Sequence, residues 1–386
     1  CPFMGGTAYL RHADVVRMLT NAPAERAQKT VSRGNELGFH LLDSCVFPGV
    51  PRKTASGEGL ACKGTLGLGG TYEEHRIQRQ WIEQLLDPGR MPDRDKWLEE
   101  VKAFLVDTGK KGKLVLREDV NRWWQRMLWR HVLGHELTEK EAEDFVNFQS
   151  HWLHCCIQPL ADHVADYLPS WTVGERVWGK EKILKLQADY RQKVAGLLPT
   201  NLQSEDRLLV AQGVLEMLVF TGGHCVPHTI HAAMAVLFTP EILLSPTEAT
   251  SKGNVERFVY EVTRLFPAVE GFCQWREGTR EVLSLSAALR DPQVWGDEAH
   301  VFSLKELDMY KANHVGFADQ ARTEKSSFDS MACPGAKIAM DVLQAFVLGV
   351  SDMGHLRPEG ISAESVLFWS PKVFPRPCGG PLWWES

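Results

Sequence analysis

Residues 331–339 read Met331-Ala332-Cys333-Pro334-Gly335-Ala336-Lys337-Ile338-Ala339, and they place a single cysteine directly before an apolar run. The apolar run Ala336–Leu348 predicts a buried helix. It would start near Pro334, where a missing N–H costs nothing. The helix amides and positive dipole end would then favour thiolate over thiol at Cys333. A single cysteine before a helix is more often an inert buried thiol, so the motif needs support from the rest of the chain.

A second motif, Glu261-Val262-Thr263-Arg264, lies about seventy residues upstream. Its Glu and Arg fall on one helix face and can pair. Such pairs usually lie on a solvated surface. Here the pair belongs to an otherwise apolar helix, predicted over Asn254–Phe266 and closed by Pro267. A pair inside an apolar helix needs further partners to offset desolvation.

Five motifs in order resemble those of the cytochrome P-450 family. EVTR resembles its ExxR motif, ALRDPQVW its AxRDPxxF segment and CPGAKIA the stretch that begins with its haem-ligating cysteine. Upstream, YLRHADVVRML and EEHRIQRQWIEQLL resemble its B and C helices. The resemblance extends from about residue 9 to residue 346. It implies one mainly α domain, residues 1–386, with a small β part and the family's triangular-prism shape. Haem b would lie between a long central helix and the helix after Cys333.

The resemblance also assigns roles. Cys333 is expected to be the axial ligand of the haem iron. Glu261 and Arg264 would form a structural ion pair, with His300 as its third member. The haem propionates are anions that need cationic or donor partners; those expected are His75, Arg79 and Arg276.

The cysteine loop departs from the family pattern. The family usually has Phe seven residues before the thiolate and Gly four before it, where this chain has Ser326 and Asp329. Gly316 and Phe317 are instead interpreted as the opening of a longer, inserted loop. Insertion is tolerable because loop length costs little entropy.

The central helix, predicted over Glu205–Phe238, departs as well. Gly222-Gly223 matches the family's small residues, but Cys225 and Val226 stand where an acid–alcohol pair is expected. Neither side chain relays protons at neutral pH in the usual way. Pro227 then removes a helix hydrogen bond and predicts a kink.

These departures favour an enzyme that uses a hydroperoxide, by rearrangement or peroxygenation, on a hydrophobic small molecule. The expected catalytic residues are Gly223, His224 and Cys225, with His224 as the polar group nearest the distal face. One alternative is an atypical dioxygen-dependent monooxygenase with a ferredoxin or flavin reductase as partner. Another is a haem-thiolate sensor or partner subunit without catalysis. A zinc hydrolase built on His224, His228 and His231 is disfavoured, because no Glu follows the first His as in HExxH.

Composition agrees with a globular protein. The 386 residues are 44% hydrophobic and 24% charged with a net charge of −6, which excludes disorder and argues against nucleic acid as partner. The sequence contains no stretch of 18 apolar residues, so it predicts no membrane anchor. Nine cysteines without a CxxC pair indicate a reducing compartment, cytoplasmic or organellar. The start, Cys1-Pro2-Phe3, is interpreted as a trimmed end that leaves targeting open.

The remaining pattern predicts helices, a loop over 34–70 and strands within Val269–Leu289. The other predicted helices are Ala13–Leu19, Tyr72–Leu86, Asp119–Leu133, Glu139–Tyr167 and Glu181–Leu198.

Overall fold

The computed structural model describes most of the chain apart from two long stretches near residues 21–71 and 152–179 and the C-terminal region. The described ranges are 7–20, 72–87, 89–151, 180–202, 204–238, 246–251, 253–269, 271–276, 279–317, 332–353, 356–358 and 382–384. The predicted loop over 34–70 lies outside them.

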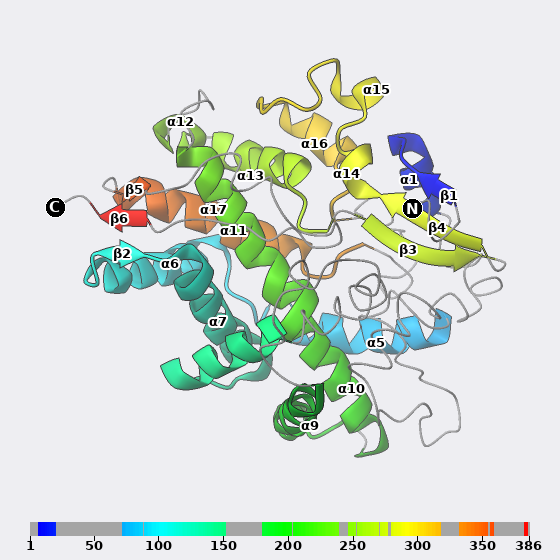
Figure 1. Ribbon diagram of the computed structural model, residues 1–386, viewed down its shortest axis with the longest axis vertical. Helices are drawn as coiled ribbons and strands as arrows, with labels where there is room; N and C mark the ends of the chain where they lie inside the picture. The colour runs from blue at the N-terminus through cyan, green and yellow to red at the C-terminus, as the bar shows by residue number, and fades with distance from the viewer. Residues whose placement is uncertain are drawn as a thin grey trace, which may run out of the picture.

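Helices dominate the structure, and four of them form its centre: α6 (Arg94–Gly109), α7 (Asn121–Leu133), α11 (Gly222–Phe238) and α17 (Ala336–Met353). Helix α17 packs along α6, and α11 contacts both α7 and α17 (Figure 1). Around them lie α5 (Tyr72–Leu85), α9 (Lys180–Leu197), α10 (Ser204–Glu216), α12 (Pro246–Thr250) and α13 (Asn254–Leu265). The mainly helical prediction is confirmed.

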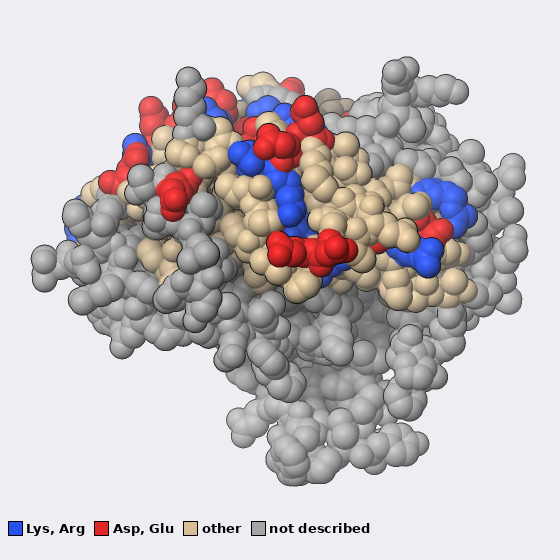
Figure 2. Space-filling model, turned by 90° about the horizontal axis from the view of Figure 1, so that it is seen from above, with Lys and Arg blue, Asp and Glu red and all other residues tan. Residues whose placement is uncertain are grey.

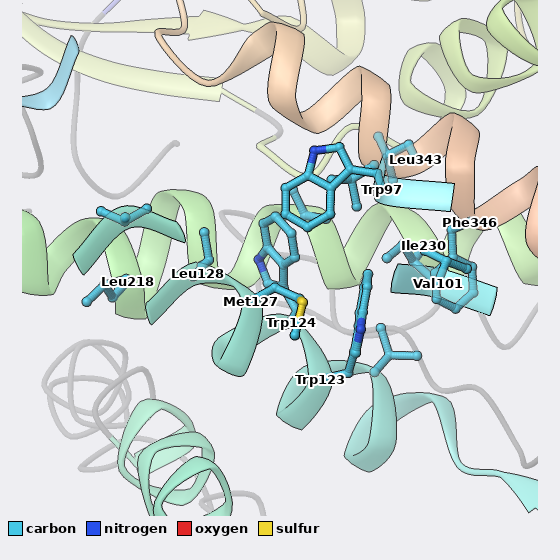
Figure 3. Packing of buried hydrophobic residues seen from close by; sticks show 14 of the residues in the cluster. Trp97, Val101, Trp123, Trp124, Met127, Leu128, Leu218, Ile230, Leu343 and Phe346 are labelled. Atoms are coloured by element: carbon cyan, nitrogen blue, oxygen red, sulfur yellow. The ribbon is translucent and has the colours of Figure 1, made fainter. Parts of the chain in front are cut away.

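Large apolar side chains fill the space between the four central helices. Figure 3 shows Trp97 of α6, Trp123 and Trp124 of α7, Ile230 of α11 and Phe346 of α17 converging on one another. The Trp97 and Trp124 rings lie 5.9 Å apart, and Trp123 lies 5.9 Å from Phe346. Burial of a side chain of this size contributes about 1.5–3 kcal/mol, so this cluster fixes the relative positions of the helices.

Helix α6 was not predicted from the sequence, although its signals are present. The Asp93 carboxylate accepts the Lys96 amide at 2.9 Å and caps the helix. Its buried face is formed by Trp97, Val101, Leu105 and Thr108, which recur at three- and four-residue spacing. Charged residues between these positions obscure the pattern in the sequence.

The other predicted helices are found close to their expected bounds. Helix α1 spans His12–Thr20, and α5, α7, α9 and α13 begin and end within two residues of the prediction. The helix expected over Glu139–Tyr167 is present from 139 to 151, and its remainder lies outside the described residues.

The long helix expected over Glu205–Phe238 is interrupted. A π turn, Met217–Thr221, separates α10 from α11. Pro227, where a kink was predicted, lies inside the helical run of α11. The irregularity therefore comes before the Gly222-Gly223 pair.

Two small sheets complete the fold. In one, β4 (Thr279–Ser284) lies between β3 (Gly271–Arg276), antiparallel to it, and β1 (Thr7–Tyr9), parallel to it. The β3–β4 hairpin confirms the strands expected in this region. The other sheet joins β2 (Lys113–Leu114), β6 (Leu382–Trp384) and β5 (Leu356–Pro358) in that order.

A second, smaller core lies beside the first sheet. Side chains of α1 pack there against Leu283, Leu285, Trp295 and Tyr310. It also includes the short helices α14 (Leu285–Ala288), α15 (Pro292–Trp295) and α16 (Leu307–Asn313). The sequence pattern predicts none of these short helices, and α14 lies at the end of the region expected to form strands.

The described part of the face seen in Figure 2 carries Lys and Arg beside Asp and Glu. Such mixing is typical of a solvated surface. Within the described residues, no helix is long and apolar enough to cross a membrane.

Candidate haem-thiolate site

Cys333 lies immediately before α17 and keeps part of its side chain accessible. The helix begins at Ala336, two residues later than expected, and Pro334 belongs to the turn that leads into it. The Ala336 amide approaches the Cys333 carbonyl at 3.4 Å and closes this turn. The N-terminal end of an 18-residue helix thus lies beside the sulfur, a setting that stabilises thiolate.

Cys333 faces the central helix α11. Burial, and secondarily the electrostatic influence of Cys333, raises the pKa of the Cys225 thiol to about 12. Cys225 lies three residues after Gly222. The helix that carries the Gly222-Gly223 pair is therefore the one expected to cover Cys333. At neutral pH Cys225 is a protonated thiol.

His224 lies about 100° around the helix from Cys225. Its ring stacks on that of His228, with centroids 6.2 Å apart and planes inclined by 29°. Cys333 contributes, as a cause second to burial, to the raised pKa of Cys225, and a catalytic role for His224 stays a prediction.

His224 and His228 stack on each other, whereas the third histidine of α11, His231, has a different partner. His228 is buried, and His231 places its Nε2 atom 2.8 Å from the Leu116 carbonyl oxygen. Among the residues that the structure describes, no group of three His, Cys, Asp or Glu could hold a metal ion. The zinc-hydrolase alternative therefore gains no support.

Arg79 of α5 reaches the cysteine segment. The side chain is 9% exposed, its Nη1 donates to the Ala332 carbonyl oxygen, and its Nε lies 2.5 Å from Glu83. A buried guanidinium next to Cys333 matches the expected position of a propionate partner. The side chains of His75, in α5, and Arg276, at the end of β3, lie outside the described part of the chain.

The predicted opening of the inserted loop agrees with the backbone contacts. The Cys333 amide donates to the Phe317 carbonyl at 2.8 Å, and residues 318–331, which include Ser326 and Asp329, lie outside the description. This hydrogen bond joins the two ends of the insertion. The loop can therefore lengthen without moving Cys333 away from Phe317.

His314 connects this loop to α13. Its Nε2 lies 3.0 Å from Thr263 Oγ1, which itself donates to the carbonyls of Val259 and Tyr260 at 2.9 Å. The Thr263 oxygen therefore accepts from His314 Nε2–H. Burial, with Arg264 as a second cause, lowers the pKa of His314 to about 3, so the ring is neutral.

The Glu261–Arg264 pair is completely buried. Arg264 donates to both carboxylate oxygens of Glu261 at 2.7 Å. Its remaining N–H groups point to the carbonyls of Leu289, Ala299 and Val301. Burial and the Glu261 carboxylate raise the pKa of the Tyr310 hydroxyl, which donates to Glu261 at 2.8 Å.

His300 is not the third member of this network, and that expectation was wrong. Its side chain is exposed, while the carbonyls of its neighbours Ala299 and Val301 turn inward to Arg264. Tyr310 and the Ser303 amide, 2.9 Å from Glu261, complete the carboxylate's hydrogen bonds. The sequence offers no signal for Tyr310, which reaches the pair from α16.

Half-buried His131 and buried His314 make stability depend on pH. Burial, followed by Arg130 and Lys96, lowers the pKa of His131 from 6.5 to about 4. In the unfolded chain this imidazole binds a proton more readily than in the folded protein. The free energy of unfolding should therefore fall as pH drops from about 6.5 to about 4. In the His131→Leu variant, the free energy of unfolding, measured with urea at several pH values, should fall less steeply with pH than in wild type. Equal slopes would contradict this prediction.

Comparison with known proteins identifies the fold of the chain. No protein-family model matches the sequence, and no curated protein matches it by sequence. Solved structures of cytochromes P-450 match nearly the whole chain. The chain therefore has the cytochrome P-450 fold, as the ordered motifs predict, in a divergent sequence.

Three of these structures illustrate the similarity. A myxobacterial cytochrome P-450 in complex with myristic acid is 15% identical, with 98% of this chain and 90% of that chain covered at a TM-score of 0.66. The LnmA cytochrome P-450 hydroxylase from the leinamycin biosynthetic pathway of Streptomyces atroolivaceus is 18% identical, covering 98% and 91% at 0.65. Cytochrome P-450 SP alpha in complex with (R)-ibuprofen is 14% identical, covering 97% and 89% at 0.63.

The side chains around Cys333 fit a haem. A partly accessible thiol at a helix N-terminus supplies the soft ligand, and buried Arg79 supplies a cation beside it. The opposing face carries a protonated thiol rather than a carboxylate or an ammonium group.

Proposed function

We propose that the chain is a haem-thiolate oxidoreductase of the cytochrome P-450 type, acting on a hydrophobic small molecule. The observation that supports this most is the position of Cys333 in front of α17, a helix that packs on α11, with buried Arg79 donating to the neighbouring Ala332 carbonyl. Cys333 would hold the iron of haem b, and Arg79 would bind a propionate. When bound, haem supplies redox chemistry at O–O bonds. The myristic acid bound by one structural neighbour supports a lipid-like substrate.

We further propose that the oxidant is a hydroperoxide. Activation of dioxygen requires a group that delivers protons near neutral pH. A thiol with a pKa of about 12 retains its proton, and Val226 has none to give. A hydroperoxide already carries the electrons and proton that dioxygen lacks, so this side of α11 would only need to orient and shield it.

The test is an optical spectrum followed by two turnover assays. The reduced protein with CO should show the Soret position of thiolate ligation, and Cys333→Ser should lose it. Fatty-acid hydroperoxides should then be consumed without a reductant. NADPH with a ferredoxin and its reductase should support little turnover.

Two outcomes would contradict the proposal at different levels. A Soret band unaffected by Cys333→Ser would exclude the haem-thiolate assignment. A thiolate spectrum with efficient dioxygen-dependent turnover, and none with hydroperoxides, would retain that assignment and exclude the peroxide mechanism. A protein that binds CO but turns over neither oxidant would be a sensor.

A further inference from the structure

Two buried glutamines contact the central helix from neighbouring helices. Gln125 of α7 is 0% exposed and donates through Nε2 to the Leu218 carbonyl at 2.8 Å. Gln149, in the helix over 139–151, is 4% exposed and donates to the Val219 carbonyl at 2.7 Å. The two amides also approach each other, with Gln125 Nε2 3.3 Å from Gln149 Oε1.

Both carbonyls belong to the π turn Met217–Thr221. In this turn the Gly222 amide reaches back five residues to the Met217 carbonyl. A π turn is a one-residue insertion in a helix that weakens the regular i to i−4 pattern. A buried carbonyl left without a donor costs about 1–3 kcal/mol. The glutamine amides supply donors to the π turn and so favour it over a regular α-helical turn.

Adjacent contacts support the same geometry. Trp124, next to Gln125 on α7, donates its indole N–H to the Gly222 carbonyl at 2.8 Å. A Cβ on Gly223 would lie 2.6 Å from Gln125 Nε2. Helix α7 therefore contacts the backbone on both sides of the junction between the π turn and α11.

The π turn determines which residues of α11 face Cys333. Each residue inserted or removed rotates the two sides of a helix against one another by about 100°. Closing the turn would have to rotate Gly222–Val226 relative to α10, or move α10 itself. In the structure, the side chain under the electrostatic influence of Cys333 is Cys225.

We propose that Gln125 and Gln149 are positioning residues that hold the π turn and thereby fix the rotation of the first turn of α11, which carries Cys225, about the helix axis. The catalytic part of this inference rests on the proposed function, because the side chain that α11 presents toward the haem would decide which oxidant can be used. It deepens that function by naming the residues that hold α11 in place. The geometric part concerns only residues of this chain.

The test compares Gln125→Met and Gln149→Met, which keep side-chain length but remove the amide donors, with Gln187→Met. Gln187 is 4% exposed on α9 and donates to Gln212 of α10 at 3.4 Å, not to a carbonyl of the π turn. In the haem-loaded protein, amide hydrogen exchange over residues 217–226 should rise at least tenfold in the first two variants. Gln187→Met should leave exchange there unchanged.

Infrared spectroscopy provides a measurement that a general loss of stability would not change. The S–H stretch of Cys225, isolated by subtracting the spectrum of the matching Cys225→Ser protein, should shift in Gln125→Met and Gln149→Met. It should stay in place in Gln187→Met. If Gln125→Met does not fold, Gln149→Met alone decides, because it leaves the Gln125–Leu218 bond in place.

Unchanged exchange and an unchanged S–H band in folded Gln149→Met would overturn the proposal. The two proposals can fail separately. Exchange and S–H changes as expected in a protein without a thiolate Soret band would retain the positioning role and exclude the haem-thiolate function. A thiolate spectrum with no response to either glutamine would do the reverse.

Discussion

Gly223→Ala should be among the most damaging single substitutions in the chain, with an expected loss of about 3 kcal/mol or more in the free energy of unfolding. A Cβ at this position would lie 1.6 Å from the Leu218 carbonyl oxygen and 2.6 Å from Gln125 Nε2. The oxygen belongs to the backbone of the π turn, so a rotamer change cannot relieve the clash. The turn or α11 would have to move, and Cys225 would move with it.

Gly196→Ala is the matched control. Gly196 lies inside α9, and a Cβ there would meet nothing within 4 Å. Alanine should stabilise this helix by about 0.5–1 kcal/mol, because it loses less backbone entropy on folding. Urea unfolding and haem content measure both variants. If Gly223→Ala were as stable as wild type, residues 217–223 would not form this π turn in solution.

The sequence predicted the order of elements because their signals are local. Helical periodicity located α5, α7 and α13, and alternation with turn residues located the β3–β4 hairpin. Helix α6 was not predicted because charged residues stand in the sequence between the positions of its buried face. Pro227 predicts a kink further along α11, but no residue predicts the π turn at 217–221.

The site was predictable where a motif carries its own chemistry. The Glu261–Arg264 pair was identified in this way. The roles of Cys333, from the same kind of motif, and of Arg79, from its place in a recognisable helix, stay predictions. The supporting residues were not, because their roles depend on long-range packing. Tyr310 lies 49 residues from Glu261, and Gln125 lies 93 from Leu218. His300 failed as a candidate because its neighbours act through backbone carbonyls, which any residue type provides.

Breaking the Glu261–Arg264 pair should remove about 3–5 kcal/mol, a large fraction of the total stability of an ordinary domain. Arg264→Lys is the sharpest test, because it keeps the charge. Arginine directs its N–H groups to both Glu261 oxygens and to three carbonyls, on Leu289, Ala299 and Val301. Lysine has three donors on one atom and cannot satisfy five acceptor sites.

The guanidinium also lies 5.1 Å from the Trp295 ring centroid, a contact that lysine would make differently. Glu261→Gln should be comparably damaging, because it leaves Arg264 buried without its counter-charge. Tyr310→Phe removes a single donor and should cost about 1–3 kcal/mol. A graded series, with Tyr310→Phe mildest, would show that both the number of donors and the counter-charge hold the network together.

The control for this series is Arg17→Lys, in an Arg–Asp pair of the same i, i+3 spacing. Arg17 and Asp14 have side chains 56% and 41% exposed, so their 2.9 Å contact contributes little. That variant should unfold within about 0.5 kcal/mol of wild type. If Arg264→Lys were equally mild, water would have to reach the pair. In that case the buried network would not hold α13 in a fixed position relative to His314 and Phe317, the residues that lead to Cys333.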